Sequence, residues 1–204
     1  MEIVILEVLI LLDFVKEIER GINENGGKGA KYFTTDICDG QAQGHDGMNY
    51  SLASREFIAD MIEIQAGATP FDAGVFVASC DKGMPANLMA AARLNIPSIV
   101  FTGGIMAAGP NMLTLEQLGT YSARFERGEI TKEEFCYAKE NACPSCGACS
   151  FMGTASTMQV MAEALGLALP GTALLPAISP DLMTKAYEVG VRALELAKEG
   201  IRPS

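Results

Sequence analysis

The sequence has no tryptophan, a single histidine and no cluster of basic residues. Its 15 Lys and Arg are outnumbered by 25 Asp and Glu, which leaves a formal net charge of −10. Because nucleic acids and anionic membranes attract basic surfaces, neither is an expected partner. A Ser–His–Asp hydrolase would depend on His45 alone, and a lone histidine more often makes a structural hydrogen bond. No Gly-Lys-Ser/Thr phosphate loop is present either.

Long uninterrupted apolar runs are also missing. The apolar segment 1–15 is broken by Glu2, Glu7 and Asp13 and has no basic residues before it. We therefore expect neither a signal peptide nor a membrane span there, and we expect a cytoplasmic protein. In a reducing cytoplasm, the six cysteines are better explained by metal binding or catalysis than by disulfides.

What the sequence does contain is enough apolar material, 49% over 204 residues, for one sizeable core. Buried strands are expected at 73–79 and 97–104, with a helix at 85–95 between them. Apolar strands joined by a helix are typical of a parallel sheet. The prediction is a single α/β domain over residues 1–204, with a parallel or mixed sheet flanked by helices. Further helices are expected at 9–25, after Ser54, at 115–127, at 132–140, within 153–171 and at 181–200.

Local signals set several of these boundaries. Gly26 and Gly27 are expected to end the first helix. Ser54 is expected to be the N-cap of the helix that follows it. Thr114 and Thr131 each begin a capping-box pattern, which predicts a helix after each of them.

Cys80, Asp81 and Lys82 directly follow the strand expected at 73–79. At the carboxyl end of a parallel strand, side chains reach the crevice where α/β proteins bind ligands. A thiolate suits an iron–sulfur cluster or zinc, and a carboxylate suits magnesium. The alternative is a buried cysteine followed by an aspartate that caps the next helix.

Cys143, Cys146 and Cys149 form two overlapping Cys-x-x-Cys patterns. They precede an expected helix N-terminus, which would lower the pKa of a thiol. An iron–sulfur cluster and a zinc site completed by Cys38 or Cys80 are both compatible with the pattern. The second, well-separated Cys-x-x-Cys pair of a typical structural zinc site is missing.

A glycine-rich loop at 39–51 carries Asp39, His45 and Asp46. Such a loop can bring carboxylates close to a ligand, and a metal would be needed to offset their charge if that ligand were a phosphate. Cys136 lies inside an expected helix and is interpreted as a packed residue.

Three segments resemble the dihydroxy-acid dehydratase/phosphogluconate dehydratase family, which includes sugar-acid dehydratases. They are DGQAQGHDGMNYSLASREFIAD, CDKGMPANLMAAARLNIPSIVFTGGIMAAG and CPSCGACSFMGTASTMQVMAEALGLALPG. The resemblance implies a hydro-lyase that converts a 2,3-dihydroxy acid or a sugar acid to a 2-keto acid. It also implies a homodimer, and for the dihydroxy-acid branch a role in branched-chain amino acid biosynthesis.

The resemblance further implies a [2Fe–2S] or [4Fe–4S] cluster held by three cysteines, two of which match Cys80 and Cys149. It implies Mg²⁺ bound by Asp39, Asp81 and a carbamylated Lys82, which serves catalysis as a magnesium ligand. The two other cysteines of the 143–149 segment are then neighbours of the cluster or packing residues.

Departures from the family pattern limit what the resemblance implies. The family's first cluster cysteine lies in an Asn-Pro-Cys stretch that this sequence lacks, and Cys38 is a candidate replacement. The family's C-terminal half, which carries another magnesium-binding Glu and the Ser thought to act as base, is also not found. Smaller departures are Ala86-Asn87 in place of Gly-Met and SFMGTAS in place of SGMFTAN.

The expected protein is thus the N-terminal portion of such a dehydratase, truncated and inactive alone. One alternative is a non-catalytic metal-binding subunit that pairs with a separately encoded C-terminal half. Another is a zinc-stabilised module.

Overall fold

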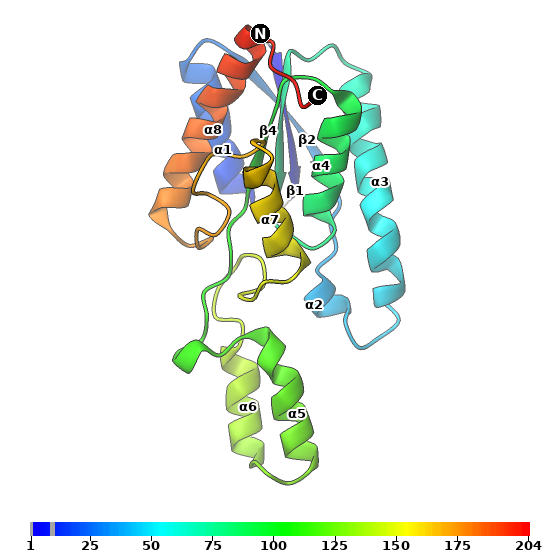
Figure 1. Ribbon diagram of the computed structural model, residues 1–204, viewed down its shortest axis with the longest axis vertical. Helices are drawn as coiled ribbons and strands as arrows, with labels where there is room; N and C mark the ends of the chain where they lie inside the picture. The colour runs from blue at the N-terminus through cyan, green and yellow to red at the C-terminus, as the bar shows by residue number, and fades with distance from the viewer. Residues whose placement is uncertain (1, 9–10) are drawn as a thin grey trace.

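Four parallel strands form a sheet with helices on both of its faces (Figure 1). The computed structural model describes residues 2–8 and 11–204, and of residues 2–8 it describes the backbone alone. The strands lie in the order β2-β1-β3-β4. This confirms the α/β prediction. The bounds are β1 Glu2–Val8, β2 Lys28–Thr34, β3 Ala73–Ala78 and β4 Ser98–Thr102.

The strands β3 and β4 are buried on both faces, which explains their continuous apolar sequences. Val75 and Val77 belong to the core beneath α1 (Leu12–Glu24) and α8 (Pro180–Glu199). The alternate residues Phe76 and Ala78 belong to the core on the opposite face. That second core is formed with α3 (Met48–Gly67), α4 (Gly83–Leu94) and α7 (Thr154–Ala164).

Two glycines let α1 and α8 approach each other closely. A Cβ atom on Gly21 would collide with the backbone oxygen of Tyr187, and one on Gly190 would collide with that of Ile18. The two helices therefore pack backbone to backbone at this crossing, because any side chain there would push them apart.

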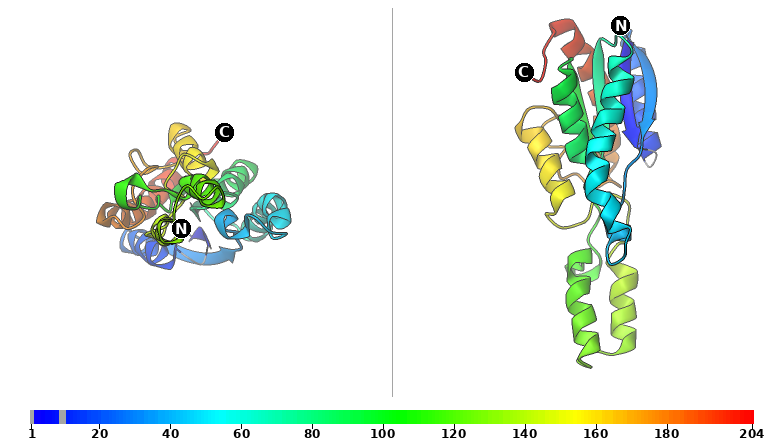
Figure 2. Two further views of the ribbon diagram at one scale, coloured as in Figure 1. Left: turned by 90° about the horizontal axis from the view of Figure 1, so that it is seen from below. Right: turned by 90° about the vertical axis from the view of Figure 1, so that its right-hand side faces the viewer.

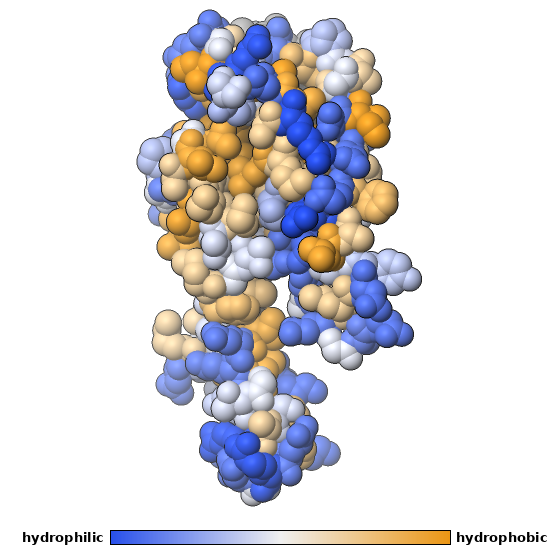
Figure 3. All heavy atoms as spheres, turned by 45° about the vertical axis from the view of Figure 1, so that its right-hand side comes forward, coloured by the Kyte–Doolittle hydropathy of each residue, from blue (hydrophilic) through white to orange (hydrophobic). Residues whose placement is uncertain are grey.

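A helical hairpin projects from one end of the molecule, away from the sheet (Figure 2). It consists of α5 (Leu118–Glu126) and α6 (Lys132–Asn141). The rings of Phe125 and Phe135 stack between them with centroids 5.1 Å apart. Hydrophilic side chains cover most of the hairpin in Figure 3, whereas apolar side chains are exposed over parts of the body above it.

The hairpin tests two of the predicted helix starts. The capping box at Thr131 is confirmed, since its side chain accepts from the Glu134 backbone and the Glu134 carboxylate accepts from the Thr131 N–H. The capping box at Thr114 is wrong. Its side chain makes no capping hydrogen bond, and a short 3-10 turn, η3 (Leu115–Gln117), precedes α5. A further 3-10 turn, η2 (Pro110–Met112), lies before it.

The N-cap prediction at Ser54 is also wrong, because α3 begins six residues earlier at Met48. Ser54 is buried within the helix and its hydroxyl donates to the backbone oxygen of Ser51. The glycine-rich loop before α3 contains a short helix, α2 (Asp39–Ala42).

The first helix ends as expected before the two glycines: Glu24 is its last residue, Asn25 is the C-cap, and Gly26 follows in the left-handed region. Of the range 9–25 expected for this helix, residues 9 and 10 lie outside the described residues. The strand at residues 2–8 had no predicted counterpart. No helix in the described part of the chain has the length and apolar character needed to cross a membrane.

Candidate metal and substrate site

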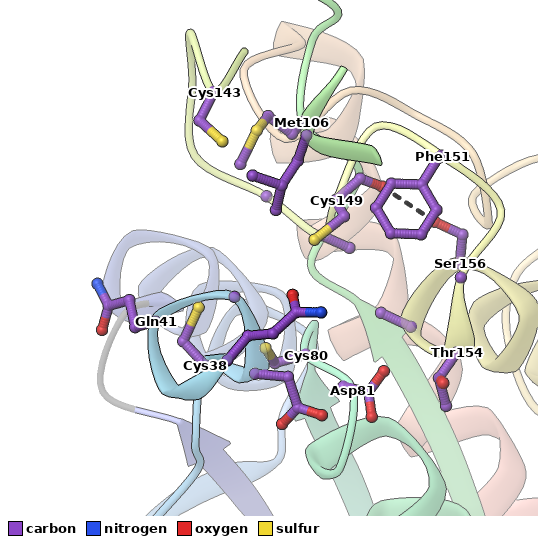
Figure 4. Close-up of a pocket in the computed structure, with 18 of the residues that line it drawn as sticks. Cys38, Gln41, Cys80, Asp81, Met106, Cys143, Cys149, Phe151, Thr154 and Ser156 are labelled. Atoms are coloured by element: carbon purple, nitrogen blue, oxygen red, sulfur yellow. Dashed lines mark hydrogen bonds between the residues drawn. The ribbon is translucent and has the colours of Figure 1, made fainter. Parts of the chain in front are cut away.

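A pocket of about 650 Å³ lies where three segments meet (Figure 4). The first segment follows β2 and includes α2, the second is the turn between β3 and α4, and the third leads into α7. Its size is within the range of small-molecule sites. All five residues predicted from the family resemblance line it: Asp39, Cys80, Asp81, Lys82 and Cys149.

Lys82 joins the first two segments. Its ammonium group donates to Oδ2 of Asp39 at 2.9 Å and also to Oδ2 of Asp81. Oδ1 of Asp39 accepts from the hydroxyl of Ser51 at 2.6 Å. Two carboxylate oxygens from separate segments therefore converge on one cationic nitrogen, whose side chain is only 13% exposed.

The charges in this group reinforce one another. Burial opposes the charged form of Lys82, but hydrogen bonds and attraction from Asp81 and Asp39 outweigh it and raise its pKa. Burial likewise opposes the charged form of Asp39. The hydrogen bonds from Ser51 and Lys82 outweigh that effect and lower the pKa of Asp39. At neutral pH this group is an ion pair.

Asp36 is a further carboxylate beside this group. One of its oxygens accepts from the backbone N–H of Ile37 at 2.8 Å, and the other is buried against Gly83 at the start of α4. Burial, together with the negative charges of Asp39 and Asp81, raises the pKa of Asp36 to about 6. Gly83 leaves room for it, since a Cβ atom there would overlap the carboxylate.

Four of the six cysteines line the pocket: Cys38, Cys80, Cys143 and Cys149. Burial, with the charge of Asp36, raises the pKa of Cys80 to about 12, and burial also raises the pKa of Cys149. The expectation that a helix N-terminus lowers the thiol pKa values of this segment is wrong for Cys143 and Cys149. The helix α7 begins only at Thr154, and burial acts in the opposite direction.

Other candidate residues have local roles. Nε2 of His45 lies 2.8 Å from the backbone oxygen of Gln41, and its Nδ1 accepts from the N–H of Gly47 at 3.0 Å. Both ring nitrogens are thus used within the loop, as expected of a structural histidine. The N-cap residue of α4 is Lys82 rather than Asp81, and it makes no side-chain capping hydrogen bond. Cys136 lies in α6, outside the pocket.

Among the described residues, no three His, Cys, Asp or Glu side chains are arranged as ligands of a single metal ion. The convergent oxygen donors are two carboxylates, and the third group at their centre is the amine of Lys82.

Sequence reasoning missed Ser51 and Asp36. Ser51 was assigned to the loop, and only the earlier start of α3 places its hydroxyl beside Asp39. Asp36 lies three residues before Asp39, but nothing in its local sequence shows that it packs against Gly83.

Comparison with known proteins identifies relatives of this chain. Residues 8–204 match the family described as dihydroxy-acid/6-phosphogluconate dehydratase N-terminal. The chain is 44% identical over 95% of its length to a dihydroxy-acid dehydratase of Moorella thermoacetica, and 47% over 96% to one of Caldanaerobacter subterraneus. A dihydroxy-acid dehydratase of Syntrophobacter fumaroxidans is 46% identical over 95%.

In each of these comparisons the chain spans 36% of the relative's length. The family match covers all of the pocket residues and every strand of the sheet except β1, of which it includes only the last residue. The chain therefore belongs to the dihydroxy-acid/6-phosphogluconate dehydratase N-terminal family.

Proposed function

We propose that this chain is the metal-binding N-terminal portion of a hydro-lyase that converts a 2,3-dihydroxy acid to a 2-keto acid. A dihydroxy-acid dehydratase-like activity is favoured over that on sugar acids, because the relatives described above are named dihydroxy-acid dehydratases. The observation that carries the proposal is the convergence of Asp39 and Asp81 on Lys82, in the same pocket as Cys80 and Cys149.

The oxygen donors fit Mg²⁺. Magnesium prefers carboxylate and other hard oxygen ligands, and two carboxylate oxygens here already face a shared positive centre. In the proposal, Asp39 and Asp81 hold the ion, and Ser51 keeps the carboxylate of Asp39 oriented through its hydrogen bond.

Carbamylation of Lys82 would supply the missing oxygen ligand. The neutral amine forms a bond to the carbon of carbon dioxide and releases a proton to solvent, which gives an anionic carbamate. The raised pKa of Lys82 keeps the amine protonated while both carboxylates face it. Carbamylation is therefore expected to depend on Mg²⁺, because a bound ion would compete with the ammonium group for the two carboxylates. Carbon-13 NMR with labelled bicarbonate tests this. A carbamate signal that depends on Mg²⁺ should be lost in Lys82→Ala and kept in the control Lys185→Ala.

The thiols fit an iron–sulfur cluster. Cys80 and Cys149 are partly buried cysteines on separate segments of one pocket, and thiolates are the usual ligands of such clusters. Their raised pKa values mean that the free thiols stay protonated until metal displaces the protons. When bound, the cluster and Mg²⁺ would supply Lewis acidity for loss of the hydroxyl group and for stabilisation of the negative charge left on the substrate.

We do not assign to this chain the base that removes the substrate proton. The carboxylate of Asp39 and the ammonium of Lys82 are engaged with each other, and His45 is used within its own loop. The family resemblance places the base in the C-terminal half, so we assign it to the part of the relatives that this chain does not span, contributed by a longer polypeptide or by a separately encoded partner. A homodimer, as implied by the resemblance, is part of the same proposal.

An anaerobic assay tests the activity. The chain is reconstituted with iron, sulfide and Mg²⁺ and supplied with several dihydroxy and sugar acids, alone and with the separately expressed remainder of the Moorella relative. We expect 2-keto acid only in the combined sample, because loss of part of a catalytic unit costs orders of magnitude in rate. Turnover by the chain alone would contradict the assignment of the base to the part that this chain does not span. A chain that binds one zinc and no iron would contradict the proposed dehydratase function.

A further inference from the structure

Two Cys-Asp dipeptides line the same pocket. Cys38-Asp39 follows β2 and Cys80-Asp81 follows β3, and in a parallel sheet both strands end at the same edge. Asp39 and Asp81 meet at Lys82. The cysteine before each aspartate is thereby brought to the same side of the pocket.

The pocket lining extends this relationship to the thiols. Cys38, Cys80 and Cys149 all line the pocket. In Figure 4 the thiols of Cys38, Cys80 and Cys149 point into the same space from three segments of the chain.

Cys143 lines the same pocket and is the competing candidate. Asp39, the residue after Cys38, contacts Lys82, which lies two positions after Cys80. Cys38 is thereby held near the Cys80 turn, whereas Cys143 belongs to the same segment as Cys149. Cys38 is also exposed, so its thiol can turn toward a bound group without disturbing the core.

We infer that Cys38 is the third thiolate ligand of the iron–sulfur cluster, together with Cys80 and Cys149. The inference rests on the proposed function, because it presupposes that a cluster is bound. Of the two roles that the sequence left open for Cys38, it selects replacement of the family's first cluster cysteine over completion of a zinc site. The Cys-Asp dipeptide at each of the two strand ends would then contribute its thiol to the cluster and its carboxylate to Mg²⁺.

Anaerobic reconstitution of the full chain with ferrous iron and sulfide tests this inference. The readouts are visible absorption, iron and sulfide content per chain, and the electron paramagnetic resonance spectrum after reduction. We expect Cys38→Ala to lower cluster occupancy at least about tenfold. Loss of a residue that only supports a metal ligand already lowers metal affinity by about tenfold or more, and loss of a ligand should cost at least as much. Cys38→Ser is expected to retain some iron with a shifted spectrum, because a serine oxygen replaces sulfur.

Cys143→Ala is the matched control, since it removes a thiol from the same pocket, and it should retain the wild-type spectrum. Thermal unfolding of the metal-free variants checks that both are folded, as expected for exposed positions. Wild-type occupancy in Cys38→Ala would overturn the inference and leave the proposed function standing. A wild-type chain that binds no iron and sulfide would overturn both.

Discussion

The ammonium group of Lys82 lies 2.9 Å from the carboxylate of Asp39, a residue 43 positions earlier in the chain. This pair joins the segment after β2 to the turn after β3, and both side chains are largely buried, at 13% and 19% exposure. It is the structural link between the two halves of the candidate site.

Asp39→Ala should destabilise the metal-free chain by about 1–3 kcal/mol, because it leaves Lys82 with one carboxylate partner in a poorly solvated position. Urea unfolding measures this change. Asp13→Ala is the control, since it breaks the exposed pair between Lys16 and Asp13 and should have no measurable effect. Equal effects of the two substitutions would show that the Asp39 pair contributes no more than a surface pair.

Asp36→Asn should stabilise the metal-free chain at pH 7 but not at pH 4. The pKa of Asp36 rises from 3.8 to about 6 on folding, so the folded chain binds the proton more tightly than the unfolded chain. The free energy of unfolding therefore falls as pH rises from about 4 to 6. Removing the charge should recover about 1–2 kcal/mol at pH 7.

Urea unfolding at both pH values tests this prediction, with the exposed Asp46→Asn as control. A gain of the same size at pH 4 and pH 7 would show that the effect of Asp36→Asn does not come from its charge.

Gly190→Ala should destabilise the fold by about 1–3 kcal/mol, since its Cβ atom would collide with the backbone oxygen of Ile18 and force α8 away from α1. Gly119 in α5 has open space around its Cβ position. Gly119→Ala is therefore expected to be neutral or to stabilise the chain by up to about 1 kcal/mol. Thermal unfolding compares the two, and a neutral Gly190→Ala would mean that the two helices do not approach as closely as described.

Thr131→Ala should weaken α6 by about 1 kcal/mol, because it removes the side-chain half of the capping box. Thr114 has the same sequence pattern but makes no capping hydrogen bond, so Thr114→Ala should leave the stability of α5 unchanged. Amide hydrogen exchange of the two helices distinguishes them. Faster exchange in α5 after Thr114→Ala would favour the sequence pattern over the structure.

Sequence patterns predicted β3, α4, β4 and α8 well, because these elements are long, strongly apolar or clearly bounded. The strand at residues 2–8 was missed because its apolar residues continue into those of the next predicted element. The starts of α3 and α5 were misplaced because Ser54 and Thr114 satisfy a local rule that tertiary packing overrides.

The candidate site shows the same limit. The Cys80-Asp81-Lys82 turn was recognisable as ligand-binding chemistry at a strand end, and family resemblance added Asp39 and Cys149. Asp36 and Ser51 could not be found from the sequence. Their roles depend on Gly83 and Asp39, which reach them only through the folded chain.

The central claim is that the turn after β3 presents Cys80 to an iron–sulfur cluster and Asp81 and Lys82 to Mg²⁺. The most direct measurement is the visible absorption and iron content of the anaerobically reconstituted chain, compared with those of Cys80→Ser. We predict a sulfide-dependent iron–sulfur chromophore in the wild type that is lost or strongly shifted in Cys80→Ser. A colourless wild-type protein, or the same chromophore in both proteins, would contradict the claim.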